Sequence, residues 1–410
     1  MIFDSIILFE SKLEVEKFYP FTVLHPIWEL RIGAMRIFEK YQVVFEASSF
    51  SFYSANPLIL DSFLNRFSIE SKESKSNKKL ILSSQLLPSS QLASQLGDLI
   101  TDNLSNYTIR LNEKIVGYYT DAFLDGLESI DGLNSENYKS VSLDSDTKYL
   151  NYIWDAISYN ESILIDDANY YRNWNSPKEE YSKGVHYLEK SQIFISETVK
   201  IHPNVVIDAS EGAVIIDENV KIMAGSTILG PCYIGKNSTI KVGAKIYGST
   251  SIGEVCKVGG EVEGSIIQSY SNKQHDGFLG HSFISEWVNL GADTNTSDLK
   301  NTYSEITVLQ RDNEVKTGTM FLGLICGDHT KSAINTQFNT GTIAGVCGIL
   351  VRPGFLPNHI KSFSWGGLQT SPTYKYSKAI EVCEIVMQRR GKKLTDSERE
   401  LLQLEYDKVK

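Results

Sequence analysis

The sequence predicts an N-terminal α/β domain followed by a parallel β-helix and a short C-terminal helical tail. Three observations predict this fold class. The chain has 410 residues, and at roughly 100–200 residues per domain it should form two or three domains. Aliphatic residues recur at every sixth position over a long central stretch, and apolar residues near the C-terminus follow helical spacing. These patterns place the three parts at residues 1–180, 181–370 and 371–410.

Composition and charge narrow the function classes. Fifty acidic and 40 basic residues give a net charge of −10, which disfavours broad binding to nucleic acid or to an anionic membrane. The five cysteines are dispersed and odd in number, so neither a disulfide framework nor a thiolate zinc site is expected. No apolar run is long enough to span a bilayer, and residues 6–9 are too short for a secretory signal. We therefore expect a cytoplasmic protein.

The first part combines short strands with helices. Residues 6–9 and 80–82 are short apolar runs of the kind found in buried strands. Trp154 and Ile157 belong to a pattern that predicts a closing helix. Residues 170–183, rich in aromatic and polar side chains, predict a linker to the next part.

The second part carries a six-residue repeat. Eight aliphatic residues from Ile216 to Val258 fall at steps of six without a gap. An earlier set keeps the same step but is shifted by three residues, which places a short insertion at residues 211–213. The earlier set consists of Ile195, Ile201 and Ile207. After a break the repeat resumes at Ile284 and Leu290, and it resumes again at Ile343 and Ile349.

A step of six fits neither a helical face nor a simple alternating strand. It fits a short strand followed by a tight turn, with several such strands in each coil and the coils stacked about 4.8 Å apart. The aliphatic residue of each hexad then points into the resulting prism. Breaks in the register mark the places where loops leave the prism, and loops of this kind commonly bind ligands.

The third part predicts two helices. Gly391 is a plausible stop for the first helix, and Thr395 with Glu398 forms a capping-box pattern that opens the second. The apolar residues that share one face of the first helix are Ala379, Val382, Cys383 and Val386.

One segment concentrates groups suited to acid–base chemistry. Residues 271–282 hold two of the seven histidines, His275 and His281, in a glycine-bearing stretch where the hexad register fails. Acyl transfer to an amine needs a base near neutral pH, and a histidine with an ordinary pKa of about 6.5 meets that need. Backbone N–H groups or an asparagine amide would then stabilise the developing oxyanion.

The repeats resemble the left-handed parallel β-helix of bacterial hexapeptide-repeat acyltransferases, which are typically trimers that bind acetyl-coenzyme A between neighbouring prisms. Residues 271–294 resemble, without a gap, the acetyltransferase half of the GlmU-like family that makes UDP-N-acetylglucosamine. The resemblance implies that His275 is the catalytic base. The substrate-binding residues that it implies are Lys241, Asn289, Asn301 and Tyr303.

The same resemblance implies that Ala292, Thr294 and Ile334 contact acetyl-coenzyme A. The sequence also departs from the family. Phe278 replaces a sugar-contacting tyrosine, Lys241 stands where the family has arginine, and a short insertion separates Asn301 from the preceding match. These departures affect the identity of the amino sugar more than the type of reaction.

The first part resembles the sugar nucleotidyltransferase half of this family, through residues 6–10, 20–26, 29–33 and 39–40. The family's glycine-rich phosphate loop is missing, because no glycine occurs between Phe9 and Gly33. The resemblance implies that Arg31 and Lys40 bind the nucleotide, whereas a purely structural pairing of Arg31 with Glu29 or a neighbouring acidic residue is equally consistent with the sequence. Carboxylates for Mg²⁺ would come from Asp121, Asp125 or Asp131, and the sequence does not choose among them.

The function expected from this resemblance is acetyl-coenzyme A-dependent N-acetylation of an amino sugar phosphate, fused to a nucleotidyltransferase-like domain that uses UTP or dTTP to make nucleotide-sugar precursors of the cell envelope. Two alternatives remain open. In the first alternative, residues 1–180 form an inactive domain that serves only for regulation or as a scaffold. In the second, the prism is a metal-dependent hydrase in which His275 and His281 are two of three imidazole ligands.

Overall fold

The computed structural model describes residues 2–47, 49–69, 78–101, 106–122, 130, 133, 136, 138–174, 184–311, 313–368 and 370–410. The chain forms two compact units. The first comprises Met1–Phe18, Leu24–Leu30 and Met35–Tyr152, and the second comprises Tyr19–Val23, Arg31–Ala34 and Ile153–Lys410. The predicted domain boundary at residue 180 lies outside the described residues. Helix α6 (Ile153–Asp167), which the sequence analysis placed in the first part, belongs to the second unit.

The first unit is built on a six-stranded mixed sheet of order β10-β8-β9-β7-β2-β6. Strand β2 lies between β6 and β7 and is parallel to both, whereas β9 is antiparallel to β7 and β8. The predicted strands at residues 6–9 and 80–82 are confirmed as β2 and β7. The elements are β2 (Ile6–Glu10), β6 (Phe50–Ser54), β7 (Lys79–Ser83), β8 (Tyr107–Leu111), β9 (Lys114–Thr120), β10 (Lys139–Ser142), α1 (Lys12–Val15), α2 (Ile37–Val44), α3 (Pro57–Phe67) and α4 (Ser90–Thr101).

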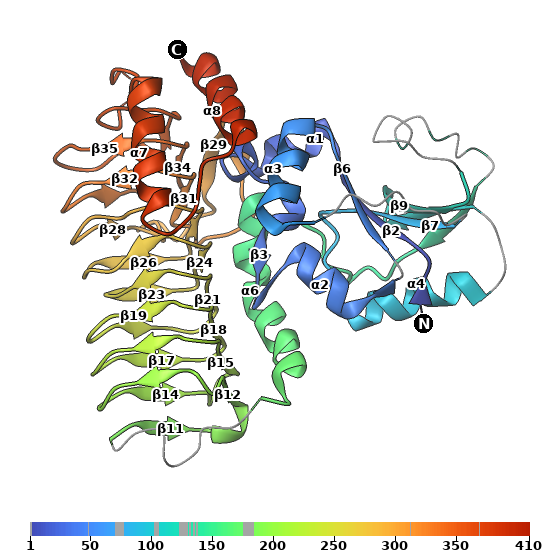
Figure 1. The fold of residues 1–410 in the computed structure, drawn as a ribbon, viewed down its shortest axis with the longest axis horizontal. Coiled ribbons are helices and arrows are strands. Elements are labelled where there is room, and N and C mark those ends of the chain that lie inside the picture. Colours follow the sequence, from blue (N-terminus) through green and yellow to red (C-terminus); the bar gives the residue numbers. More distant parts are fainter. Residues whose placement is uncertain are drawn as a thin grey trace. The chain divides into compact units, whose positions relative to one another are not determined.

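The second unit is a parallel β-helix whose short strands stack coil on coil, as Figure 1 shows. Its first face contains β11 (His186–Leu188), β14 (Val206–Asp208), β17 (Thr227–Leu229), β20 (Lys245–Ile246), β23 (Glu261–Glu263) and β26 (Phe278–Gly280). Its second face contains β12 (Ile193–Ile195), β15 (Val214–Ile216), β18 (Cys232–Ile234), β21 (Thr250–Ile252), β24 (Ile266–Ile267), β27 (Phe283–Ile284), β31 (Leu324–Cys326), β34 (Thr342–Ala344) and β36 (His359–Ile360).

The third face carries the candidate site. It begins with β13 (Lys200–Ile201), β16 (Lys221–Ile222), β19 (Thr239–Ile240), β22 (Lys257–Val258) and β25 (Asn272–Lys273). Parallel bridges from Asn272 to Asn289 and from Asn289 to Lys331 continue it to β32 (Lys331–Ser332) and β35 (Ile349–Leu350). Strand β28 (Asn295–Thr296) pairs in parallel with β33 (Gln337–Phe338). Strands β29 (Thr307–Gln310) and β30 (Asn313–Lys316) form an antiparallel hairpin outside the regular coils.

The hexad residues fill the interior of the prism, as predicted. All eight residues from Ile216 to Val258 are at most 1% exposed, and Ile284 and Leu290 belong to the same core. The prediction was wrong for Ile343 and Ile349. After the inserted loop the register resumes one residue later, so Ala344 and Leu350 face the core instead. Because side chains alternate along a strand, a shift of one residue turns Ile349 outward.

The tail forms the two predicted helices, α7 (Tyr376–Gln388) and α8 (Asp396–Val409). Thr395 caps α8 and forms the predicted capping box with Glu398. Ala379 and Cys383 of α7 are buried, and Gly391 adopts a φ of +68° after the helix ends. All five cysteines are buried free thiols. Among the described residues, no helix has both the length and the apolar character needed to cross a bilayer.

Candidate functional site

Three of the predicted site residues lie at one corner of the β-helix. His275, Ala292 and Ile334 each follow the inward-facing residue of a third-face segment by two positions. His275 and Ile334 are exposed and Ala292 is half-buried. The structure therefore places the predicted base in the same corner column as two residues predicted to contact the cofactor, Ala292 one coil away and Ile334 two coils away. Their common register follows from three third-face residues stacked in parallel, Asn272, Asn289 and Lys331.

Two other predicted residues lie close to this corner. Asn289 is half-buried on the third face, where its side-chain oxygen lies 3.4 Å from the amide nitrogen of Asn272. Thr294 is buried, and its hydroxyl lies 2.9 Å from that of Ser332. The hydroxyl of Thr294 therefore ties two coils together.

Lys273 holds the turn that carries His275. It occupies the inward position of β25, paired with Val258 in the coil below, and is only 2% exposed. Its Nζ donates to the carbonyl oxygens of His275 at 2.6 Å, Gly259 at 3.3 Å and Asp276 at 3.3 Å. Burial lowers the pKa of Lys273 to about 8, against the attraction of the Asp276 and Asp293 carboxylates. Sequence reasoning missed this residue, because a lysine breaks the aliphatic pattern.

A pocket of about 420 Å³ opens beside this corner, between the third face and α7. Asn289 lines it, together with Gln274, the residue that precedes His275. The other lining residues are Lys257, Tyr270, Asn272, Trp287, Lys331, Val386, Arg389 and Arg390. The sequence analysis did not predict Arg389 and Arg390 as site residues. The sequence shows only that they lie at the end of a predicted helix, which does not indicate that they line a pocket.

An aromatic column borders the pocket. The rings of Tyr270 and Trp287 are stacked with centroids 4.3 Å apart, and His329 continues the column 6.1 Å from Trp287. All three residues have positive φ angles, between 60° and 63°. Bulky side chains rarely adopt this conformation, which costs roughly 1–2 kcal/mol per residue. Stacking offsets part of that cost, and Tyr270 and Trp287 form one wall of the pocket.

His281 has a structural environment. Its Nδ1 lies 2.8 Å from a carboxylate oxygen of Asp298, and its ring packs against Phe321. Among the described residues, no cluster of three or more His, Cys, Asp or Glu side chains is arranged to hold a metal ion. The imidazole of His281 is thus already engaged by a carboxylate.

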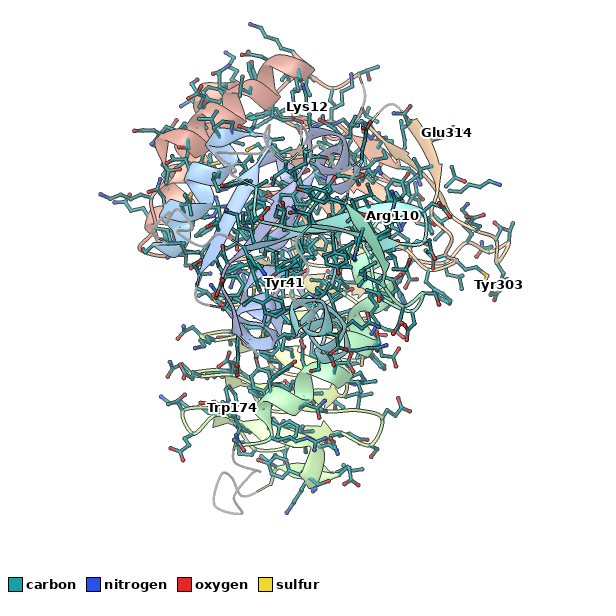
Figure 2. The ribbon with its side chains drawn as sticks, turned by 90° about the vertical axis from the view of Figure 1, so that its right-hand side faces the viewer. Lys12, Tyr41, Arg110, Trp174, Tyr303 and Glu314 are labelled. Atoms are coloured by element: carbon teal, nitrogen blue, oxygen red, sulfur yellow. The ribbon has the colours of Figure 1, made fainter. Side chains whose placement is uncertain are left out.

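Asn301 and Tyr303 lie in the loop that leaves the coil stack before β29. Tyr303 is 71% exposed and projects away from the prism in Figure 2. Neither residue lines the pocket beside His275. Lys241, in contrast, lies close enough to the pocket for its charge to lower the pKa of Lys257.

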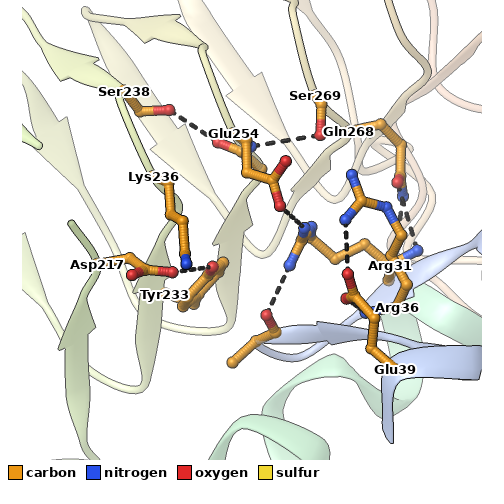
Figure 3. A network of polar contacts seen from close by, with 12 residues as sticks. Arg31, Arg36, Glu39, Asp217, Tyr233, Lys236, Ser238, Glu254, Gln268 and Ser269 are labelled. Atoms are coloured by element: carbon orange, nitrogen blue, oxygen red, sulfur yellow. Dashed lines mark hydrogen bonds and ion pairs between the residues drawn. The ribbon is translucent and has the colours of Figure 1, made fainter. Parts of the chain in front are cut away.

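Arg31 is buried and belongs to the second unit, and Figure 3 shows its polar contacts. Its guanidinium donates to the carbonyl oxygen of Ala34 at 2.6 Å and to Glu254 at 3.2 Å, and it lies 5.2 Å from the ring centre of Tyr233. The observed acidic partner of Arg31 is Glu254. Nucleotide binding by Arg31 stays a prediction, and its observed contacts are structural.

Lys40, the other predicted nucleotide contact, lies on α2 and is 3% exposed. After β2 the chain continues into the short helix α1 instead of a glycine-rich loop. Glu10, at the carboxyl end of β2, accepts hydrogen bonds from the Ile27 amide and the Ser54 hydroxyl, both at 2.7 Å. Burial raises the pKa of Glu10 to about 7.

Of the three candidate magnesium ligands, only Asp121 is described. It is exposed, and its backbone N–H donates to the side chain of Asn106. Asp125 and Asp131 lie outside the described residues. The donor set for Mg²⁺ therefore stays a prediction.

Comparison with known proteins finds a match in each of the two main parts of the chain. Residues 6–173 match a family described as sugar nucleotidyl transferase, and residues 213–248 match six bacterial transferase hexapeptide repeats. The chain is therefore similar to GlmU-like bifunctional proteins in both its nucleotidyltransferase-like and its hexapeptide-repeat part. The order of the two GlmU-like parts agrees with the resemblance seen in the sequence.

The relatives of this chain are described as bifunctional proteins. It is 28% identical over 256 residues to a bifunctional protein GlmU of Methanococcus aeolicus, covering 62% of this chain and 61% of the relative. It is 32% identical over 168 residues to a bifunctional sugar-1-phosphate nucleotidylyltransferase/acetyltransferase of Sulfurisphaera tokodaii, covering 40% of this chain and 41% of the relative. The matches thus span less than two thirds of each relative's length.

Proposed function

We propose that the β-helix transfers an acetyl group from acetyl-coenzyme A to the amine of an amino sugar phosphate similar to glucosamine-1-phosphate. The observation that supports this most is the corner where His275 lies exposed above a fixed turn, with Ala292 and Ile334 in the next coils and Asn289 in the adjoining pocket. The hexapeptide repeats and the bifunctional relatives agree with this reaction class.

In the proposed reaction, neutral His275 removes a proton from the substrate amine as the nitrogen attacks the thioester carbonyl. The new C–N bond replaces the C–S bond, and the leaving thiolate of coenzyme A takes up the proton that His275 removed, so coenzyme A departs as its thiol. Asn289 orients the sugar from the pocket. Lys273 keeps the His275 turn in place through its three carbonyl contacts and does not touch the substrate. Ala292, Thr294 and Ile334 belong to the coils that would receive the pantetheine arm.

We further propose that the first unit is a sugar-1-phosphate nucleotidyltransferase-type domain that would use UTP or dTTP with Mg²⁺. One observation favours the alternative that this domain binds a nucleotide sugar without turnover. Both residues assigned to the triphosphate, Arg31 and Lys40, are buried. Pyrophosphate release, measured with several sugar phosphates and nucleoside triphosphates, separates the two: clear turnover would exclude the inactive alternative.

The acetyl-transfer proposal is tested by His275→Ala. We expect acetyl transfer to fall by about 10²–10⁴-fold, the usual contribution of a general base, while the proposed homotrimer persists in sedimentation. His186→Ala is the matched control, because His186 is exposed on β11, five strands from β26 along the first face. Equal rates in the two variants would refute His275 as the base.

A further inference from the structure

Four cationic side chains line the pocket beside His275. Lys257 and Lys331 come from the third face of the β-helix, and Arg389 and Arg390 follow the end of α7. Within the described part of the chain, none of the four forms an ion pair with a carboxylate. Two of them donate hydrogen bonds to neutral oxygens: Lys331 Nζ to the His329 carbonyl at 2.8 Å, and Arg390 to the Asn272 side chain at 3.4 Å.

These positive charges repel one another. Burial lowers the pKa of Lys257, and the nearby charges of Arg390, Lys241 and Arg389 lower it further. Burial also lowers the pKa of Lys331. The negative end of the α7 dipole offsets part of this repulsion at the arginines. The fold thus brings several cations together, and none of the described carboxylates forms an ion pair with them, which is the arrangement expected of an anion site.

The remaining lining indicates which anion fits. Phosphate is doubly charged near neutral pH and offers several acceptor oxygens, which suit guanidinium forks and ammonium groups. Three side-chain amides, from Asn272, Gln274 and Asn289, can bond sugar hydroxyls, and the wall of Tyr270 and Trp287 offers an apolar face. A volume of about 420 Å³ lies within the usual range for small-molecule sites.

We propose that helix α7 completes a phosphate-binding site, in which Arg389 and Arg390 act with Lys257 and Lys331 to hold the phosphate of the amino sugar substrate. The inference rests on the proposed acetyl transfer for the identity of the ligand, but the anion site itself does not. It makes the helical tail part of the substrate site. A chain without the tail would then lose affinity for the phosphorylated sugar while keeping the His275 corner.

The test compares three variants of the full chain. Arg389→Gln/Arg390→Gln removes the cations of the tail, and Lys257→Gln removes one from the β-helix without altering α7. Lys378→Gln/Lys393→Gln is the control, because it removes two charges from α7 and the residues just after it, outside the pocket. Calorimetric titration with inorganic phosphate gives affinity without turnover, and acetyl transfer to glucosamine-1-phosphate and to glucosamine gives KM.

Loss of a hydrogen bond to a charged group corresponds to roughly 10–100-fold in affinity. We expect phosphate affinity to fall about 10-fold or more in the double arginine variant and in Lys257→Gln, and to be unchanged in the control. KM for glucosamine-1-phosphate should rise by a similar factor, with kcat and the KM for acetyl-coenzyme A unchanged. Lys257→Gln leaves α7 unchanged. An equal loss of phosphate affinity in Lys257→Gln and in Arg389→Gln/Arg390→Gln would therefore exclude simple undocking of α7 as the cause.

Two outcomes separate the inference from the proposed function. If phosphate binding is lost in the variants but wild-type protein acetylates no amino sugar, the anion site holds and the acetyl-transfer proposal fails. If wild-type protein acetylates glucosamine-1-phosphate and all variants keep its KM, the function holds and the site is overturned. Absence of phosphate binding by wild-type protein also overturns the site.

Discussion

Replacing Lys273 by Met tests whether a buried ammonium group holds the His275 turn. Lys273 has a pKa of about 8 in the folded chain, below its ordinary value of 10.5. Each unit of difference corresponds to 1.36 kcal/mol, so the shift amounts to about 3 kcal/mol. Between pH 8 and 10.5 the unfolded chain keeps the proton and the folded chain releases it. The unfolding free energy therefore rises with pH across this window.

The assay is urea unfolding between pH 7 and 10. We expect the contribution of Lys273 to raise the unfolding free energy of the wild-type protein by about 2.5 kcal/mol over this range. Lys273→Met should lack this rise. Lys245→Met is the control, because Lys245 is an exposed lysine paired with Glu261 on the first face. Since other groups titrate in the same range, the informative quantity is the difference between variants.

The same substitution also tests the link to catalysis. Met fills the space but donates nothing to the carbonyl oxygens of Gly259, His275 and Asp276. Displacement of a catalytic group by about 1 Å costs roughly 100-fold in rate, so kcat for acetyl transfer should fall by about that factor with KM unchanged. Parallel stability curves for wild-type protein and Lys273→Met would refute the reasoning, whatever the activity.

Two further predictions concern local conformation and pH. Gly277 has a φ of +111°, and a Cβ there would lie 2.2 Å from the Thr294 carbonyl oxygen, whereas Gly243 has a φ of +68° with open space around it. Thermal unfolding should show that Gly277→Ala costs about 3 kcal/mol or more and Gly243→Ala about 1 kcal/mol; equal losses would contradict the packing described. Glu10 has a pKa raised from 4.5 to about 7, so the folded chain holds its proton longer and stability falls by up to about 3 kcal/mol as pH rises from 4.5 to 7. Urea unfolding should show this decline missing in Glu10→Gln and kept in the exposed control Glu113→Gln; a decline kept in Glu10→Gln would contradict it.

The hexad register was predictable because every coil imposes the same steric demand. An inward position must be apolar and compact, so periodicity alone located Ile216 and Val258 in the core. The capping box at Thr395 was predictable for a similar reason, since both of its hydrogen bonds join residues three positions apart. Such features depend on local sequence, so they can be predicted without knowing which distant residues are in contact.

The cation pocket was not predictable in this way. Arg390 and Lys257 are 133 positions apart in the sequence, and only the docking of α7 brings them together. Arg31 illustrates the same limit, because its partner Glu254 lies 223 residues away. Local sequence therefore left nucleotide binding and a structural pairing of Arg31 equally consistent, and the observed contact with Glu254 is structural.

The break in the hexad register is the feature that positions His275. From Val258 to the next inward residue, Val262, the step is four residues instead of six. The shortened corner contains Gly259 and Gly260, where an added Cβ would meet the Gln274 or His275 carbonyl oxygen at 2.7 Å. Only glycine fits beneath the turn, and the close approach lets the ammonium of Lys273 reach carbonyl oxygens from both coils. A regular hexad would insert two residues at this corner and separate those carbonyl oxygens. The shortened step thus fixes the backbone of the turn that exposes His275, and insertion of two residues to restore a six-residue step should abolish acetyl transfer while the protein still folds.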